Sequence, residues 1–216
     1  MVEGEKIVLE CIKHIPEKIE IIACLSEEID LIPPELKLKC LILTNKDLDR
    51  ISNQKSPNKL FAVIKKSTTN PFNPNLNFLI LDNIQDPGNM GTIIRTADWF
   101  GIHQIICSEN CVDIYNSKVL QSSMGSFLRV TVKYKDLISF LEESNFNITG
   151  AFLHGDELEK EKLKNSIAIM LGNEGHGISR ELEKYCNQPI KIKGLGGAES
   201  LNVSSAASIL MYEWTK

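Results

Sequence analysis

The fold of the larger part of this chain is decided by residues 78–97, which read Phe78-Leu-Ile-Leu-Asp-Asn-Ile-Gln-Asp-Pro-Gly-Asn-Met-Gly-Thr-Ile-Ile-Arg-Thr-Ala97. Four consecutive apolar residues predict a buried strand over Phe78–Leu81. The polar residues that follow predict a turn through Asp86-Pro87-Gly88-Asn89, because proline fixes φ while glycine and asparagine tolerate a left-handed φ. We expect a helix to begin near Gly91 and to present free backbone N–H groups above the strand ends.

The helix predicted over residues 92–100 ends at Gly101 and carries Arg95 one turn from its start. The neighbours of Arg95 are apolar or small, so its guanidinium needs a partner such as a carboxylate or a phosphate. Spacing alone leaves two interpretations open. One is an ordinary capped helix whose arginine pairs with an acidic neighbour, and the other is a functional site.

Strands and helices continue to alternate after this helix. The pattern predicts strands over residues 104–107, 128–132, 148–152, 166–171 and 189–192, and helices over residues 116–123, 136–143, 179–185 and 203–214. Such alternation predicts an α/β fold with a mostly parallel sheet and helices on both faces. Ligands of such sheets bind at the carboxyl ends of the strands, which is where we look for chemistry.

A polar run rich in proline and asparagine precedes this region and reads as a linker over residues 67–77. It separates a small domain, residues 1–66, from a larger one, residues 78–216. The small domain is predicted to be an α/β unit with a helix over Glu5–His14, a short helix ending at Ile51, and strands over residues 19–25, 41–43 and 60–64. It contains no visible catalytic constellation.

Composition narrows the class of protein. The chain has 216 residues, 43% of them hydrophobic and 24% charged, as in a globular soluble protein. It has no apolar run long enough to span a membrane and no secretory signal, and its six cysteines lack zinc-site spacing, so we expect a cytoplasmic protein without a metal. Net charge is −4 and lies in residues 71–216, so nucleic-acid binding would need a local basic surface.

A second segment with chemical character spans residues 167–178. An apolar strand runs directly into a loop with glycines at 172, 175 and 177, which let a ligand approach the backbone closely. Glu174 among them is either a turn residue or a functional acid. His176 is best interpreted as an exposed bystander.

The third segment spans residues 194–210, where a glycine-rich loop leads through Ser200 and Asn202 into the last helix. Serine and asparagine before a helix are strong N-cap residues, so a simple capped helix is as good an interpretation as a site. The glycine fingerprint for dinucleotides, the phosphate-binding loop and the hydrolase nucleophile motif are all missing from the sequence.

Taken together and in this order, the three segments resemble the three motifs of the SpoU/TrmH branch of the SPOUT methyltransferases, over about residues 78–216. The first domain, which opens Val2-Glu-Gly-Glu-Lys6, resembles the L30-like RNA-binding domain. The resemblance implies a trefoil knot, a homodimer, and transfer of a methyl group from S-adenosylmethionine to a ribose 2′-hydroxyl in structured RNA. By analogy, rRNA is the expected substrate rather than tRNA.

The resemblance also assigns roles to individual residues. Catalytic positions fall on Asn89, Arg95, Glu174, Ser200 and Asn202, and cofactor-binding positions fall on Leu171, Gly172, Ile192 and Leu201. The chain departs from the family at Lys193, where the family usually has proline. A basic segment often precedes the first domain in the family, so we expect part of that RNA-binding surface to be missing here.

Methyl transfer to a hydroxyl is an in-line displacement, so positioning of the 2′-oxygen should supply much of the catalysis. A guanidinium holds its proton strongly, and we therefore expect Arg95 to bind the adjacent phosphate and stabilise developing alkoxide charge rather than act as a base. Three rival functions remain: a tRNA ribose methyltransferase, a non-catalytic RNA-binding protein on the same fold, and a nucleotide-binding oxidoreductase, which the missing fingerprint disfavours.

Overall fold

A computed structural model describes residues 1–52, 54–66 and 71–216. The chain forms two compact units, Met1–Thr68 and Thr69–Lys216. Residues 67–70 of the predicted linker lie outside the described residues, but residues 71–77 pack on the second unit. The ring of Phe72 lies 5.0 Å from that of Phe78, edge to face, and the Asn73 N–H donates to Gln104 Oε1 at 2.7 Å. The second unit therefore includes part of the predicted linker.

The first unit is a four-stranded sheet with helices, and its strand order is β1-β4-β2-β3. Helix α1 buries one apolar face through Ile7, Val8 and Cys11. Its elements are β1 Val2–Glu3, α1 Glu5–His14, η1 Pro16–Lys18, β2 Ile19–Cys24, η2 Ser26–Leu31, η3 Pro34–Lys39, β3 Cys40–Ile42, α2 Asn45–Ile51 and β4 Leu60–Ile64.

The second unit is a six-stranded sheet of order β10-β8-β9-β5-β6-β7, in which every neighbouring pair is parallel. The predicted α/β fold with a mostly parallel sheet is confirmed. The elements are β5 Phe78–Leu81, α3 Pro87–Trp99, β6 Gln104–Ser108, α4 Ser117–Ser123, η4 Ser126–Leu128, β7 Thr131–Lys135, α5 Leu137–Glu142, β8 Ile148–Glu157, α6 Lys160–Leu163, β9 Ala168–Leu171, α7 Arg180–Glu183, β10 Gln188–Lys191 and α8 Val203–Thr215.

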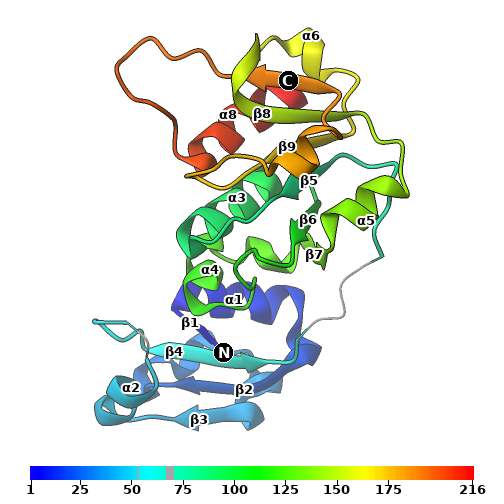
Figure 1. Ribbon diagram of the computed structural model, residues 1–216. Coiled ribbons are helices and arrows are strands. Elements are labelled where there is room, and N and C mark those ends of the chain that lie inside the picture. The colour runs from blue at the N-terminus through cyan, green and yellow to red at the C-terminus, as the bar shows by residue number, and fades with distance from the viewer. Residues whose placement is uncertain (53, 67–70) are drawn as a thin grey trace. The chain divides into compact units, whose positions relative to one another are not determined.

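Helices cover both faces of this sheet. On one face, Phe78 and Ile80 of β5 form a buried cluster with Leu137 and Leu141 of α5 and Leu182 of α7. Strand side chains alternate, so the remaining residues of β5 point to the opposite face. Helices α3 and α8 pack against each other, and α8 also contacts β9. Figure 1 shows the connection from β10 to α8 as a long, open loop.

The start of α3 differs from the prediction. The residues predicted as a turn form the first turn of the helix, with Asp86 as N-cap and Pro87 as the first helical residue. Proline suits this place because it lacks the N–H that would stay unsatisfied there, and its fixed φ matches the helix. The helix therefore starts one turn before Gly91.

Two strands also differ from the prediction. Strand β7 occupies Thr131–Lys135, not residues 128–132, because its parallel register against β6 runs from Gln104 opposite Thr131 to Ser108 opposite Lys135. Strand β8 runs on to Glu157, five residues beyond the predicted end, and its exposed second half pairs with β10. Pairing between strands, rather than burial, fixes both segments. In the described ranges, no helix is both long and apolar enough to cross a membrane.

Candidate active site

The carboxyl ends of β5 and β9 lie side by side, since Leu81 pairs with Leu171 in parallel register. The polar segments that follow these two strands therefore start from the same edge of the sheet. This edge brings the first and second motifs together, as the general rule for parallel sheets predicts.

Helix α3 begins at this edge with a firmly capped first turn. Asp86 Oδ1 accepts a hydrogen bond from the Asn89 N–H at 2.8 Å, and Asp86 Oδ2 lies 3.6 Å from Lys118 Nζ of α4. The Asn89 N–H, aided by the Lys118 charge, lowers the pKa of the Asp86 carboxyl below its ordinary value. The cap thus fixes the backbone of the residue that carries the Asn89 side chain.

Close packing of α3 on α4 further fixes this turn. A Cβ on Gly91 would lie 1.9 Å from Ser122 Oγ and 2.7 Å from the Val119 carbonyl oxygen, so a glycine is required for the two helices to approach this closely. Ser122 Oγ also donates to the Pro87 carbonyl at 3.2 Å.

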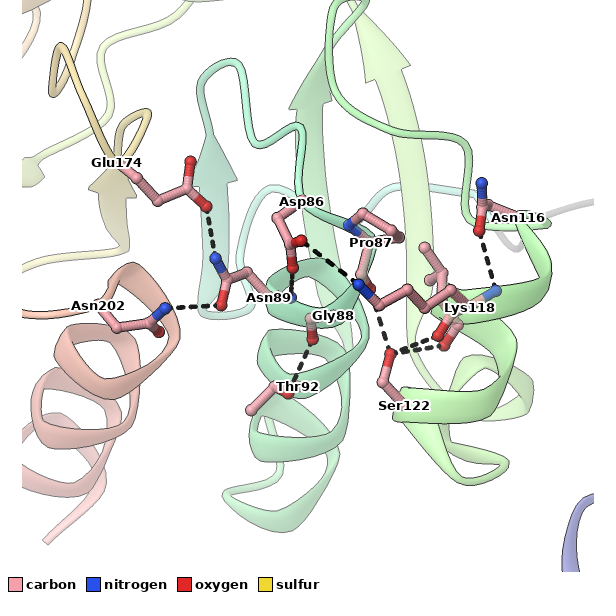
Figure 2. Close-up of polar contacts among 11 residues, drawn as sticks. Asp86, Pro87, Gly88, Asn89, Thr92, Asn116, Lys118, Ser122, Glu174 and Asn202 are labelled. Atoms are coloured by element: carbon pink, nitrogen blue, oxygen red, sulfur yellow. Dashed lines mark hydrogen bonds and ion pairs between the residues drawn. The ribbon is translucent and has the colours of Figure 1, made fainter. Parts of the chain in front are cut away.

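The side-chain amide of Asn89 joins all three motifs. Its Nδ2 donates to Glu174 Oε1 at 2.6 Å, and its Oδ1 accepts from Asn202 Nδ2 at 3.0 Å. Figure 2 shows Asn89 lying between these two partners. Glu174 lies 85 residues from Asn89 and Asn202 lies 113 residues away, so no local pattern predicts this contact.

The loop after β9, which carries Glu174, is held by residues that the sequence reading did not single out. Asn173 donates through Nδ2 to the Asn83 carbonyl at 3.0 Å and forms a backbone bridge with Gly177. The buried carboxylate of Asp82 accepts from the Ser179 N–H at 2.8 Å and from its hydroxyl at 2.5 Å. A polar residue directly after the buried strand β5 was the available signal for Asp82.

Close backbone packing in this loop requires a glycine at position 172. A Cβ there would lie 2.1 Å from the Gly177 carbonyl carbon and 2.2 Å from the Ile178 nitrogen. The backbone leaving β9 and the backbone returning toward α7 therefore touch at Gly172. Neighbouring Leu171 is buried in the sheet.

The loop after β10 carries the remaining predicted cofactor residues and is far more open. Leu201 is 50% exposed and Leu195 is 92% exposed. Asn202 ends the loop as N-cap of α8, and its Oδ1 accepts from the Ser204 N–H at 2.9 Å. Within the described part of the chain, the Ser200 hydroxyl forms no hydrogen bond, and the Asn89 side chain bonds Glu174 and Asn202 instead. Ile192 is half-buried.

Arg95 lies further along α3 than predicted, because the helix starts earlier; it is the ninth helical residue rather than one turn from the start. Its side chain is exposed, and in residues 1–52, 54–66 and 71–216 it forms no ion pair or hydrogen bond. The acidic-neighbour interpretation is therefore wrong. Arg95 is six positions after Asn89 in the same helix, which places the two side chains about 120° apart around the helix axis.

Across the residues that the structure describes, no group of three or more His, Cys, Asp or Glu side chains is placed to hold a metal ion.

Comparisons with known proteins agree with this geometry. Residues 77–212 match the SpoU rRNA Methylase family. A Bacillus subtilis (strain 168) protein, named 23S rRNA (guanosine(2553)-2′-O)-methyltransferase RlmP, is 30% identical over 98% of this chain and 86% of its own length. A Coxiella burnetii 23S rRNA (guanosine-2′-O-)-methyltransferase, RlmB, is 31% identical over 82% of this chain and 77% of its own.

Solved structures give the same fold over both units. A Porphyromonas gingivalis protein assigned to the TrmH family of RNA methyltransferases superimposes with a TM-score of 0.82, at 32% identity, over 99% of this chain and 88% of its own. The SpoU methyltransferase AviRb of Streptomyces viridochromogenes, solved with AdoMet, has a TM-score of 0.80 at 22% identity, over 99% of this chain and 88% of its own, which shows the fold. This chain therefore belongs to the SpoU rRNA methylase family.

Proposed function

We propose that this protein transfers a methyl group from S-adenosylmethionine to a ribose 2′-hydroxyl in structured rRNA. The observation that carries the proposal is the Asn89 amide, which hydrogen-bonds Glu174 and Asn202 at once and so joins three distant motifs at one sheet edge. A chain that only needed a capped helix at each motif would have no reason to bring these side chains together.

The residues present fit S-adenosylmethionine. Within the described chain, residues 192–201 form no backbone–backbone hydrogen bond, which leaves their N–H and C=O groups for a ligand. Leu201 adds an exposed apolar surface. Leu171, Gly172, Ile192 and Leu201 would hold the cofactor, largely through backbone groups. When bound, it supplies a methyl group on a positively charged sulfur.

Arg95 is proposed to supply the charge that the reaction needs. A guanidinium without a protein partner is available to bind the phosphate next to the target ribose and to stabilise negative charge on the 2′-oxygen. Asn89, Ser200 and Asn202 would orient the ribose and the loops. The geometry supports Glu174 as the acceptor that fixes the Asn89 amide, not as a partner of Arg95.

A homodimer completes the proposal. Arg95 and Trp99 are four residues apart and so share one side of α3, and Trp99 is 84% exposed. The exposed Tyr212 of α8 lies near the end of α3, with its ring 6.3 Å from that of Phe100. A second copy covering this surface would exclude water from Trp99 beside Arg95. Sedimentation should give a dimer for the wild type and a monomer for Trp99→Asp; a monomeric wild type contradicts this part.

The finer structural proposals follow from the family. They are a trefoil knot in the second unit and an L30-like, RNA-binding role for the first, with the protein acting in the cytoplasm and without a metal. A tRNA ribose methyltransferase and a non-catalytic RNA-binding protein are the alternatives. Tritium transfer to purified rRNA and tRNA separates the first alternative. Calorimetry with S-adenosylmethionine separates the second, which predicts no binding.

The central experiment is Arg95→Ala. Turnover should fall by about 10²–10³-fold, since a charge that stabilises the transition state is removed. The dissociation constant for S-adenosylmethionine should stay within about twofold, because Arg95 is not among the cofactor residues. Methyl transfer is followed by tritium incorporation and cofactor binding by calorimetry. Near-normal turnover in this variant rejects the role of Arg95.

A further inference from the structure

The ten residues between β10 and the N-cap of α8, residues 192–201, form no backbone–backbone hydrogen bond. The last backbone hydrogen bond before them is from the Leu158 N–H to the Lys191 carbonyl, at 2.9 Å. The first after them is from the Ala206 N–H to the Asn202 carbonyl, also 2.9 Å. In this fully described stretch, no backbone–backbone bond fixes residues 192–201, so side-chain contacts decide how the loop is held.

One side chain near the start of this loop forms an ion pair. Lys193 Nζ lies 3.0 Å from Glu157 Oε1 and 3.1 Å from Glu157 Oε2, so the ammonium faces both carboxylate oxygens. Glu157 is the last residue of β8, and its backbone pairs with Lys191 of β10. Within the described chain, no other side chain of residues 192–201 makes a polar contact.

The loop is thus held at two points. At the β10 end of the loop, the Lys193–Glu157 ion pair connects it to β8. At the α8 end, the hydrogen bond from Asn202 to Asn89 connects it to α3. The ion pair is weak and salt-sensitive, since the side chains of Lys193 and Glu157 are 60% and 49% exposed. Among the described residues, no other hydrogen bond or ion pair restrains the eight residues between them.

We infer that Lys193 and Glu157 are positioning residues for the cofactor loop. Their ion pair holds the first part of residues 192–201 in the conformation that receives S-adenosylmethionine, an inference that rests on the proposed function. A proline at position 193 would restrain φ independently of salt. Lysine leaves φ free and replaces that restraint with a charge pair, so cofactor affinity in this chain depends on ionic strength.

Calorimetry with S-adenosylmethionine tests the pair. At about 50 mM salt, Lys193→Ala and Glu157→Gln should each raise the dissociation constant by about two- to fivefold, the size expected of an exposed ion pair. Lys193→Arg should keep the wild-type value. At about 1 M salt the wild type and both variants should converge, because the pair is screened. The matched control is Lys65→Ala, which removes an ion pair of similar exposure in the first unit, Lys65–Glu20 at 3.7 Å.

A second readout needs no cofactor. Chymotrypsin should cleave after the exposed Leu195 faster in Lys193→Ala and Glu157→Gln than in the wild type or Lys65→Ala. Unchanged affinity and unchanged cleavage in the two loop variants overturn the inference, as does an equal loss in Lys65→Ala. If the wild type binds no S-adenosylmethionine, the proposed function fails, while the cleavage rates still decide whether the pair holds the loop.

Discussion

The loop after β9 and the loop after β10 carry predicted cofactor residues, but the protein holds them very differently. The first is fixed by the Gly172 backbone contact, by Asn173 and by the Asp82–Ser179 hydrogen bonds. The second is fixed by side chains alone near its two ends. Folding alone therefore fixes the first loop. We propose that the cofactor completes the ordering of the second, which would lower affinity but allow entry and release.

The largest expected difference between the loops concerns their glycines. Gly172→Ala should lower the free energy of unfolding by about 3 kcal/mol, because the new methyl group meets backbone atoms that cannot move independently. Gly196→Ala in the second loop meets nothing within 4 Å and should change it by less than about 0.5 kcal/mol. Urea titration of both variants measures this. Equal losses would mean that the loops are equally rigid.

The junction between the two loops gives the next effect. In the wild type, Asn89 Nδ2 lies 2.6 Å from Glu174 Oε1. Asn89→Asp replaces this donor with a carboxylate oxygen that repels the Glu174 carboxylate, so the two loops should separate. Turnover should fall about 100-fold, as misplacement of reacting groups typically costs. The double variant Asn89→Asp with Glu174→Gln restores a donor and should recover part of the loss. Activity of the double variant no higher than that of Asn89→Asp would show that the junction acts otherwise.

A smaller effect is expected from the hydrogen bonds between Asp82 and Ser179, which hold the first loop. Asp82→Asn keeps the shape of the side chain but removes its charge. The N–H and the hydroxyl of Ser179 both donate to the same oxygen of Asp82, Oδ2, so a neutral amide oxygen in its place weakens both hydrogen bonds. We expect a loss of about 1–2 kcal/mol in unfolding free energy. Ser179→Ala, which removes only the hydroxyl, should lose less. Thermal unfolding of the two variants compares them, and a larger loss for Ser179→Ala contradicts the assignment.

The smallest effect is the pH dependence of the α3 cap. The pKa of Asp86 is lowered in the folded protein, so its stabilisation is present above its ordinary value of 3.8 and is lost as pH falls through the lower folded value. The stability difference between the wild type and Asp86→Ala should therefore shrink on acidification below that value. The effect is small because the Asp86 side chain is 47% exposed. A difference that grows in acid would reverse the sign of the shift.

The sequence predicted the α/β fold and most strands because buried runs such as Phe78–Leu81 have no polar residues to obscure them. It missed the second half of β8, whose residues are exposed and belong to the sheet through pairing alone. It placed the start of α3 one turn late, since Asp-Pro-Gly-Asn fits a turn and a helix cap equally well.

Within the site, the three motifs could be identified from their order, but their contact could not. The Asn89–Glu174 and Asn89–Asn202 hydrogen bonds join residues far apart in the chain, and spacing holds no information about them. Nor could spacing show that Arg95 forms no ion pair among the described residues, since Asp98, three positions further on, pairs with Arg129 instead.

The contact of α3 with α4 at Gly91 also limits how this protein can change by mutation. Any residue larger than glycine there would push against Ser122 and Val119 and so displace the turn that carries Asn89. In a library of random variants, substitutions at position 91 should therefore be depleted as strongly as those at a residue that touches substrate, although Gly91 is buried. A smaller residue at 122 would relieve only part of the clash, because the Val119 carbonyl oxygen would still lie 2.7 Å from the new Cβ, so even paired replacements should be rare.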